Sequence, residues 1–429
     1  MPTASSAPLW RNADLLKVLI GEAISDFGSQ VGGLALPLLA ALTLDATPAQ
    51  MAALLALEYL PRIVVSLLAG GWIDRVRKKR LLIAANTLRA MVLAFLALAT
   101  AVGSVRIETL YVVAPIMTGL DVLFTASFVA YLPSLVSERS LVSANAARAT
   151  TSAAADVTGP AAAGALIGAF GAAFAIGLDA VSFLASVGGL LAVRATDHAA
   201  VTEHHRSQPL HEIVDGWRAL LGNPVLRAFT ATAFTANFFY RVVMSVYVLY
   251  LTRDLALSPA MVGAVFGLGG GLGVLLGSAA AAFASRTFGL GRTLVGAHLL
   301  FGVLGLPLAL STLMPSLGLL LVFVSEFTQL AVNAVYMVNR TSVEQVAAPV
   351  TVRGRVQAAR TVAHAVAGAL GLLVGGIVGE RFGPGAAIVL GVVGGLTSFL
   401  WLSASPIGTL RDLSDCTSAQ APGADLPNL

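Results

Sequence analysis

The sequence predicts an all-α integral membrane protein with twelve transmembrane helices. Hydrophobic residues make up 57% of the 429 residues and charged residues only 11%, a balance outside that of soluble domains. The apolar residues also come in about a dozen runs of roughly twenty, each long enough to cross a bilayer as a helix. Because a helix satisfies its own backbone hydrogen bonds in lipid, these runs favour a helical bundle.

The expected helices follow one another with short connections. The sequence places them at 16–43, 49–72, 80–102, 109–134, 146–169, 173–193, 227–251, 259–284, 292–312, 316–339, 356–379 and 385–405. A polar stretch at 195–224 separates an N-terminal six-helix half, 1–194, from a C-terminal half, 225–410. We expect residues 411–429 to form a disordered cytoplasmic tail.

Apolar residues recur at helical spacing within the 195–224 linker, at Leu210, Ile213, Val214 and Trp217. They predict a short amphipathic helix in the membrane interface. A helix that only tethers the two halves is the alternative.

The two halves resemble each other in sequence. A shift of 212 residues places Ala146-Ala147-Arg148 on Ala358-Ala359-Arg360, and a shift of 211 places Thr47-Pro48-Ala49 on Ser258-Pro259-Ala260. Copies with an even number of spans share one topology and are related by an axis along the membrane normal, as in large secondary transporters.

Basic residues predict the orientation. The connections expected outside contain only three arginines, Arg106, Arg253 and Arg381. Most others are expected in cytoplasmic segments, among them Arg89, Arg148, Arg340 and Arg360. The positive-inside rule therefore places both termini in the cytoplasm. It also explains the basic pI through anionic lipid headgroups, without a nucleic-acid partner.

The turn after the second expected helix reads GGWIDRVRKKR over residues 70–80. It resembles the G-x-x-x-D-R-x-G-R-R/K signature of the major facilitator superfamily, with arginine at 77 where the family has glycine. The matching residues are Gly70, Asp74, Arg75, Lys78 and Lys79. The resemblance implies a latch that closes the cytoplasmic side. A cluster that only follows the positive-inside rule would leave Asp74 unexplained.

The fifth expected helix carries Gly159-Pro160 followed by Gly164. This run resembles the glycine-proline motif of the superfamily's antiporters and favours export, although a kinked packing helix is the alternative. The runs 132–136, 144–146 and 353–357 resemble the subgroup of macrolide and siderophore exporters.

Charged residues lie inside the expected spans. Each charge at the bilayer centre costs about 2.5–3.5 kcal/mol, so these side chains must line water, pair or be protonated. The charged residues are Glu22, Asp26, Glu58, Arg62, Asp121, Asp156, Asp179, Arg241 and Glu326. Glu58 and Arg62, four residues apart, fit a structural ion pair.

In the superfamily, helices 1, 4, 7 and 10 line a central cavity, and each of these expected helices carries a polar stripe. The resemblance therefore implies a substrate cavity lined by Gln30, Asp121, Asn237, Arg241, Glu326, Gln329 and Asn333. Glu22 and Asp26 share one face of the first helix and are the candidates for proton coupling. If Glu22 and Asp26 do not carry the coupled proton, Asp121 and Glu326 are the next candidates.

Other activities lack their motifs. No lysine precedes Ser or Thr as a phosphate-binding loop requires, and no H-E-x-x-H motif occurs, so we expect neither an ATP-driven pump nor any other enzyme. The single cysteine, Cys416, excludes disulfides and cysteine-ligated metals. We expect no cofactor and no bound metal.

The sequence predicts a proton-coupled exporter of a small amphipathic or hydrophobic compound such as a drug, antibiotic or siderophore. We expect it to act as a monomer in the bacterial inner membrane, with lipid, protons and cargo as its partners. A proton-coupled importer and a non-transporting membrane sensor or scaffold are the alternatives.

Overall fold

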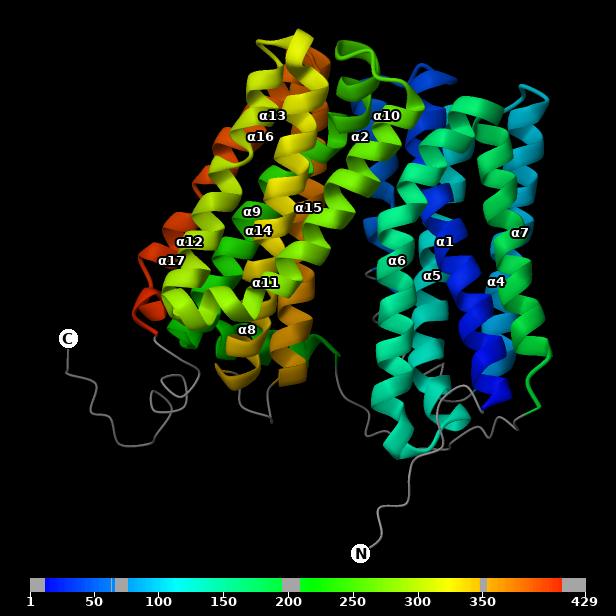
Figure 1. The fold of residues 1–429 in the computed structure, drawn as a ribbon, viewed down its shortest axis with the longest axis horizontal. Helices are drawn as coiled ribbons and strands as arrows, with labels where there is room; N and C mark the ends of the chain where they lie inside the picture. Colours follow the sequence, from blue (N-terminus) through cyan, green and yellow to red (C-terminus); the bar gives the residue numbers. More distant parts are fainter. Residues whose placement is uncertain (1–11, 63, 66–75, 195–208, 348–352, 411–429) are drawn as a thin grey trace, which may run out of the picture. The chain divides into compact units, whose positions relative to one another are not determined.

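The computed structural model describes the chain apart from residues 1–11, 63, 66–75, 195–208, 348–352 and 411–429. The described residues form helices and contain no strand (Figure 1). Ten of the described helices are long and apolar enough to cross a membrane. The protein is therefore an all-α, multi-pass membrane protein, as the sequence predicts.

Five of these ten helices are uninterrupted α-helices, and a sixth continues into a short π-helix. They are α4 (Lys78–Ala101), α5 (Ile107–Leu135), α6 (Glu138–Phe170), α7 (Ala172–Leu191), α15 (Arg353–Phe382) and α9 (Pro224–Leu249), which continues into the π-helix η2 (Tyr250–Asp254).

The other four are built from successive pieces. They are α10 (Pro259–Ala264) with the π-helix η3 (Val265–Gly271) and α11 (Leu272–Phe288); α12 (Leu290–Val303) with α13 (Leu306–Ser311); the 3-10 turn η4 (Pro315–Leu317) with α14 (Gly318–Ala347); and α16 (Pro384–Leu396) with α17 (Phe399–Ser403).

Two predicted spans are not among these ten helices. The first corresponds to α1 (Ala13–Leu42), which is 30 residues long but carries several polar side chains. The second begins with α2 (Pro48–Leu57) and then runs into residues outside the described part. The number twelve therefore stays a prediction.

The chain divides into two compact units. The first unit contains residues 1–205 and 251–268, and the second contains residues 206–250 and 269–429. The boundary between residues 250 and 251 falls within the π-helix η2, and the boundary between residues 268 and 269 falls within η3. The predicted division at 195–224 stays a prediction, and the compact units differ from it by the segment 251–268.

Backbone geometry repeats at the spacing found in the sequence. Thr47 and Ser258 each cap a helix by accepting a hydrogen bond from the N–H three residues later, and a proline follows each of them. Two residues before each cap, Asp45 and Ala256 have positive φ angles of 49° and 50°. Since left-handed backbone costs a residue with a side chain about 1–2 kcal/mol, its recurrence indicates the same turn twice.

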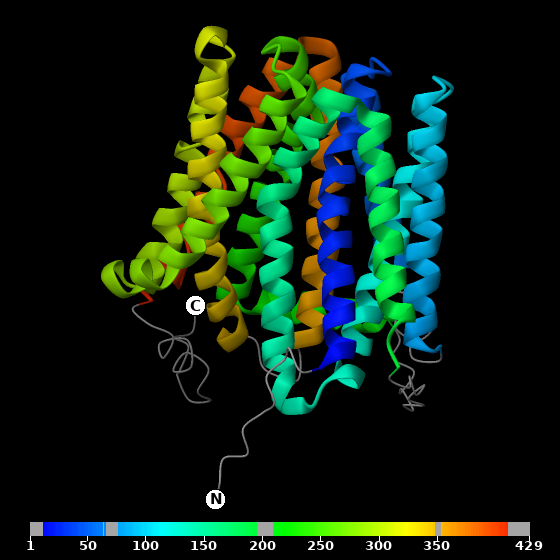
Figure 2. The same ribbon diagram turned by 45° about the vertical axis from the view of Figure 1, so that its right-hand side comes forward.

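In the first unit, α1 lies alongside α6 and α7 (Figures 1 and 2). Glycine permits this close packing: a Cβ on Gly189 of α7 would lie 2.5 Å from the carbonyl oxygen of Lys17 on α1. Gly164 of α6 and Gly263 of α10 likewise face each other, and a Cβ on Gly164 would lie 2.8 Å from the Cα of Gly263. Small residues thus bring these backbones together.

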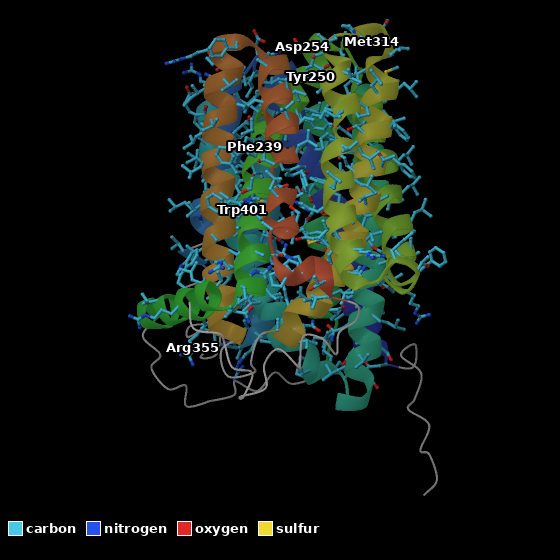
Figure 3. The ribbon with its side chains drawn as sticks, turned by 90° about the vertical axis from the view of Figure 1, so that its left-hand side faces the viewer. Phe239, Tyr250, Asp254, Met314, Arg355 and Trp401 are labelled. Atoms are coloured by element: carbon cyan, nitrogen blue, oxygen red, sulfur yellow. The ribbon has the colours of Figure 1, made fainter. Side chains whose placement is uncertain are left out.

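In the second unit, α9 packs against α15 and α16, and α11 packs against α14. A Cβ on Gly371 of α15 would lie 2.2 Å from the carbonyl oxygen of Phe238 on α9. Figure 3 shows Tyr250 and Trp401, which tie this unit together: Tyr250 shares a 2.6 Å hydrogen bond with Ser311, and the Trp401 indole donates to Thr235 at 3.0 Å.

A separate helix, α8 (Pro209–Gly222), occupies the region where the sequence predicts an amphipathic helix. It packs against α15, since a Cβ on Gly216 would lie 2.1 Å from the carbonyl oxygen of Arg355. Its location in a membrane interface stays a prediction.

Candidate functional site

Two carboxylates stand one turn apart on α1 in the first unit. Glu22 is 2% exposed, and the Ser186 hydroxyl of α7 donates a 2.6 Å hydrogen bond to it. Asp26 is half-buried and accepts a 2.9 Å hydrogen bond from Ser152 of α6. Neither carboxylate is within ion-pair distance of a cation in the described part of the chain. Two neighbouring helices therefore hold this pair with neutral donors.

A chain of hydrogen bonds connects Glu22 to a second carboxylate. The Asn86 amide of α4 donates to Ser186 at 2.8 Å, and Arg89, one turn further along α4, donates to Asn86 at 3.2 Å. Arg89 also forms a 2.6 Å ion pair with Asp121 of α5, whose side chain is 50% exposed. The chain thus joins a buried acid to a half-exposed one across four helices.

Arg89 is a residue whose role the sequence analysis missed. The expected topology places it among cytoplasmic residues, but it lies in the middle of α4 and is only 6% exposed. Its guanidinium carbon lies 4.5 Å from the ring centre of Phe183 and 5.7 Å from that of Phe124. Aromatic faces and Asp121 together offset the cost of burying this cation. The spacing of Asn86 and Arg89 on one face of α4 was the available signal.

Further polar residues lie along α1. The Gln30 amide donates a hydrogen bond to Asp156, which is exposed on α6. Asp179 of α7 is buried, and Gly32 leaves the space that its carboxylate occupies: a Cβ there would lie 2.0 Å from Asp179 Oδ2. The first unit is therefore rich in carboxylates that contact α1.

The second unit contains a cavity of about 250 Å³ between α9, α12, α14 and α15. Three predicted cavity residues line it: Asn237 and Arg241 from α9, and Asn333 from α14. The sequence analysis did not predict the others that can bind a ligand, which are Tyr240, His298, Phe301, Tyr336, Arg340 and His364. Asn237 is fixed by donating a 2.8 Å hydrogen bond to the carbonyl oxygen of His364.

A smaller cavity of about 40 Å³ shares Tyr240 and Phe301 with the first. The predicted residues Glu326 and Gln329 of α14 line it. Glu326 is buried and accepts a 2.9 Å hydrogen bond from the Tyr247 hydroxyl. The structure thus brings five of the predicted cavity residues to two adjoining cavities of the second unit, while Gln30 and Asp121 lie in the first unit.

A partly buried ion cluster adjoins the larger cavity. Glu344 of α14 is 13% exposed and pairs with Arg340 at 2.7 Å and with Arg360 of α15 at 2.5 Å. Arg340 also lies 5.9 Å from the ring centres of Phe229 and Tyr336. The Glu344 carboxylate therefore forms ion pairs with two guanidinium groups.

The comparison with known families identifies the fold. The sequence pattern of the Major Facilitator Superfamily matches residues 18–371. The chain is a member of this superfamily. No curated protein matches the chain in sequence.

Solved structures agree with this assignment. A bacterial homologue of the iron transporter ferroportin, in an inward-facing state, has a TM-score of 0.69 at 17% identity, over 92% of this chain and all of that one. A point mutant of the nucleoside transporter NupG has a TM-score of 0.70 at 14% identity, over 92% of this chain and 99% of that one. A bacterial metal transporter gives 0.67 at 16% identity, over 91% and 98%. At these identities the likeness shows the fold alone.

Part of this superfamily member's predicted latch can be described. Gly70, Asp74 and Arg75 lie outside the described residues, whereas Lys78 is buried and Lys79 donates a 2.7 Å hydrogen bond to the carbonyl oxygen of Val193. Lys17 donates to the neighbouring carbonyl of Ala192 at 3.0 Å. Two lysines thus satisfy carbonyl groups that follow α7, where cations are favourable. The latch itself stays a prediction.

The predicted helix-5 motif lies on α6. A Cβ on Gly159 would lie 2.3 Å from that of Gln30, and a Cβ on Gly164 would lie 2.2 Å from the carbonyl oxygen of Pro259. Pro160 lies inside the same helix. The motif glycines therefore let α6 approach α1 and α10 closely, and a role in antiport stays a prediction.

The predicted structural pair of Glu58 and Arg62 follows α2. Glu58 is the C-cap of α2 and is half-exposed, and Arg62 is exposed one turn later. The ion pair between them stays a prediction. Among the described residues, no three His, Cys, Asp or Glu side chains are grouped so that they could hold a metal ion.

Proposed function

We propose that this protein is a proton-coupled secondary transporter that exports a small amphipathic or hydrophobic compound across the bacterial inner membrane. The single observation that carries the proposal is the pair Glu22 and Asp26 on α1. One is buried, the other is half-buried, and each is held by a serine from a neighbouring helix. Membrane-embedded acids are costly, and in transporters they mark ion and proton pathways.

A proton on either of two carboxylates one helical turn apart removes the repulsion between their charges. Such a pair can hold a proton in one state of the transport cycle and release it in another. Release toward the cytoplasm when cargo binds, and reloading from outside, would exchange a proton for cargo. Asp121 extends this site, since the hydrogen-bonded chain through Arg89 connects it to Glu22.

The cavity of the second unit supports a small cargo with an apolar body. Phe301, Tyr240 and Tyr336 line it together with amide and guanidinium groups. Pockets of this kind bind ligands through their apolar walls and orient them through a few polar groups. Export rather than import is favoured by the glycine-proline motif on α6, and the latch residues would close the cytoplasmic side after release.

The test is transport in proteoliposomes with an imposed pH gradient and an internal pH dye. We expect the double variant Glu22→Gln, Asp26→Asn to lose gradient-driven transport while it still exchanges cargo passively. Glu108→Gln is the matched control, because Glu108 is exposed in the first turn of α5. If the double variant still concentrates cargo, the coupling acid lies elsewhere. If an inward-directed proton gradient drives cargo uptake into the proton-receiving compartment, the protein is an importer.

A further inference from the structure

The charge on the walls of the larger cavity is one-sided. Two arginines line it, Arg241 from α9 and Arg340 from α14, and no carboxylate is among its described lining residues. A cargo that carries a positive charge would therefore meet repulsion at this wall, whereas an anion would be attracted.

Carboxylates that the structure places beside the two cavities are fewer than the arginines. Glu344 is shared between Arg340 and Arg360, so one guanidinium charge of that cluster remains in excess. Glu326 lines the adjoining smaller cavity and is engaged by the Tyr247 hydroxyl. Among the described residues that line the two cavities or belong to the Glu344 cluster, three are arginines and two are glutamates.

His298 adds an independent observation. It lines the cavity, is 4% exposed, and its Nδ1 atom is buried without a hydrogen-bond partner. Its Nε2 atom lies 2.8 Å from the Ser398 oxygen, and Ser398 donates its own proton to the carbonyl oxygen of Gly395 at 2.6 Å. Nε2 must therefore be the donor to Ser398, which leaves Nδ1 of the neutral ring as an acceptor. A ligand hydroxyl or N–H group that reaches this buried atom would satisfy it.

Aromatic side chains define the shape of the space. The His298 ring is stacked on Phe301 at 6.0 Å and lies 4.7 Å from the Tyr336 ring. Tyr240 of α9 also lines the cavity, and the Arg241 guanidinium carbon lies 5.5 Å from its ring centre. The cavity volume of about 250 Å³ is slightly below the usual range of roughly 300–1,000 Å³ for ligand pockets. The walls therefore suit a planar molecule smaller than a typical drug.

We propose that this cavity binds a small planar organic anion that also carries a hydrogen-bond donor, such as a hydroxylated aromatic carboxylate. The guanidinium groups bind the carboxylate, and Nδ1 of His298 accepts the hydroxyl hydrogen. That this anion is the transported cargo rests on the proposed function. That the cavity binds it rests on the cavity's residues alone.

Isothermal titration calorimetry on the purified full-length protein in detergent tests the inference with four probes: 4-hydroxybenzoate, its neutral amide, benzoate, and 4-hydroxybenzylamine as the cation. We expect 4-hydroxybenzoate to bind most tightly, with the amide and benzoate each weaker by on the order of tenfold. The cation should bind most weakly. These comparisons use the unaltered protein and do not depend on a variant folding.

Two variants then assign the groups. Arg241→Gln should weaken 4-hydroxybenzoate by on the order of tenfold and bring its affinity near that of the amide. His298→Phe should reduce the preference for 4-hydroxybenzoate over benzoate from on the order of tenfold to about one. Arg381→Gln is the control for Arg241, because Arg381 is exposed at the end of α15.

Equal binding of the anion and the amide, tighter binding of the cation, or binding of none of the four would overturn the inference. The same probes in proteoliposomes separate it from the proposed function. Selective anion binding without gradient-driven transport would refute the proposed function and leave the site standing. Gradient-driven export of a cation, without 4-hydroxybenzoate binding, would refute the site and leave the proposed function standing.

Discussion

The two units contain residues at equivalent places of the sequence repeat but differ in the charges that they bury. Arg148 of the first unit and Arg360 of the second lie 212 residues apart, at equivalent places in the repeat. Arg148 lies 4.3 Å from the ring centre of Phe128, whereas Arg360 pairs with Glu344. The residue that corresponds to Glu344 in the first unit is Leu132. A duplicated arginine is thus stabilised by an aromatic ring in one unit and by a carboxylate in the other.

The same contrast extends to the candidate sites. Carboxylates dominate around α1 in the first unit, and guanidinium groups dominate around the cavities of the second. The residues involved are Glu22, Asp26, Asp121, Asp156 and Asp179 in the first unit, and Arg241, Arg340 and Arg360 in the second. The contrast between carboxylates and guanidinium groups fits a proposed division between proton coupling and cargo binding.

Removing the shared acid should produce the largest effect on stability. Glu344→Gln would leave the buried guanidinium group of Arg340 and the partly buried one of Arg360 without their carboxylate, so we expect the unfolding free energy to fall by about 3–5 kcal/mol. Phe128→Leu, at the other arginine, should cost only about 1–2 kcal/mol from lost packing and cation–π attraction. Unfolding in detergent measures both. Equal losses would show that the two arginines are stabilised alike.

A glycine variant tests what the two units share, which is close helix packing. A Cβ on Gly277 of α11 would lie 1.9 Å from the backbone oxygen of Ala331 on α14, so Gly277→Ala should destabilise the protein by about 2 kcal/mol. Gly296 of α12 has no neighbour within 4 Å, and Gly296→Ala should be neutral or stabilising by up to about 1 kcal/mol. Unfolding curves of the two variants measure both changes in stability. An unchanged unfolding free energy in Gly277→Ala would contradict the close packing of α11 against α14.

The smallest expected effect concerns the ion pair of the first unit. Asp121→Asn should cost about 1 kcal/mol, because Asp121 is half-exposed and the asparagine oxygen can still accept from Arg89. Thermal unfolding gives the magnitude, with Glu108→Gln as the control for an exposed acid. A loss as large as that of Glu344→Gln would mean that the two units bury their ion pairs equally.

Composition and run length were sufficient to predict the helical membrane fold, because lipid leaves few other solutions for the backbone. The repeat was also visible, since Thr47-Pro48 and Ser258-Pro259 mark equivalent helix starts. The sequence could not reveal that η2 and η3 are π-helices, because an extra residue in a turn leaves no distinct pattern in an apolar run.

The sites were predicted less completely. Asn237, Arg241 and Asn333 were found because they are polar residues on helices expected to line a cavity. His298 and Arg89 were missed because neither lies on those helices, and their roles depend on partners from other helices, such as Ser398 for His298. Contacts between distant segments are set by packing, which spacing along one helix does not encode.

The arginines around the cavity of the second unit also bear on energetics. A membrane potential contributes about 2.3 kcal/mol for each elementary charge per 100 mV. An anion that leaves a cell with a negative interior moves in the direction that this voltage favours, as does a proton that enters. For the proposed anionic cargo, one exchange cycle would therefore move two charges in the same electrical sense, and voltage alone would sustain export when the pH is equal on both sides.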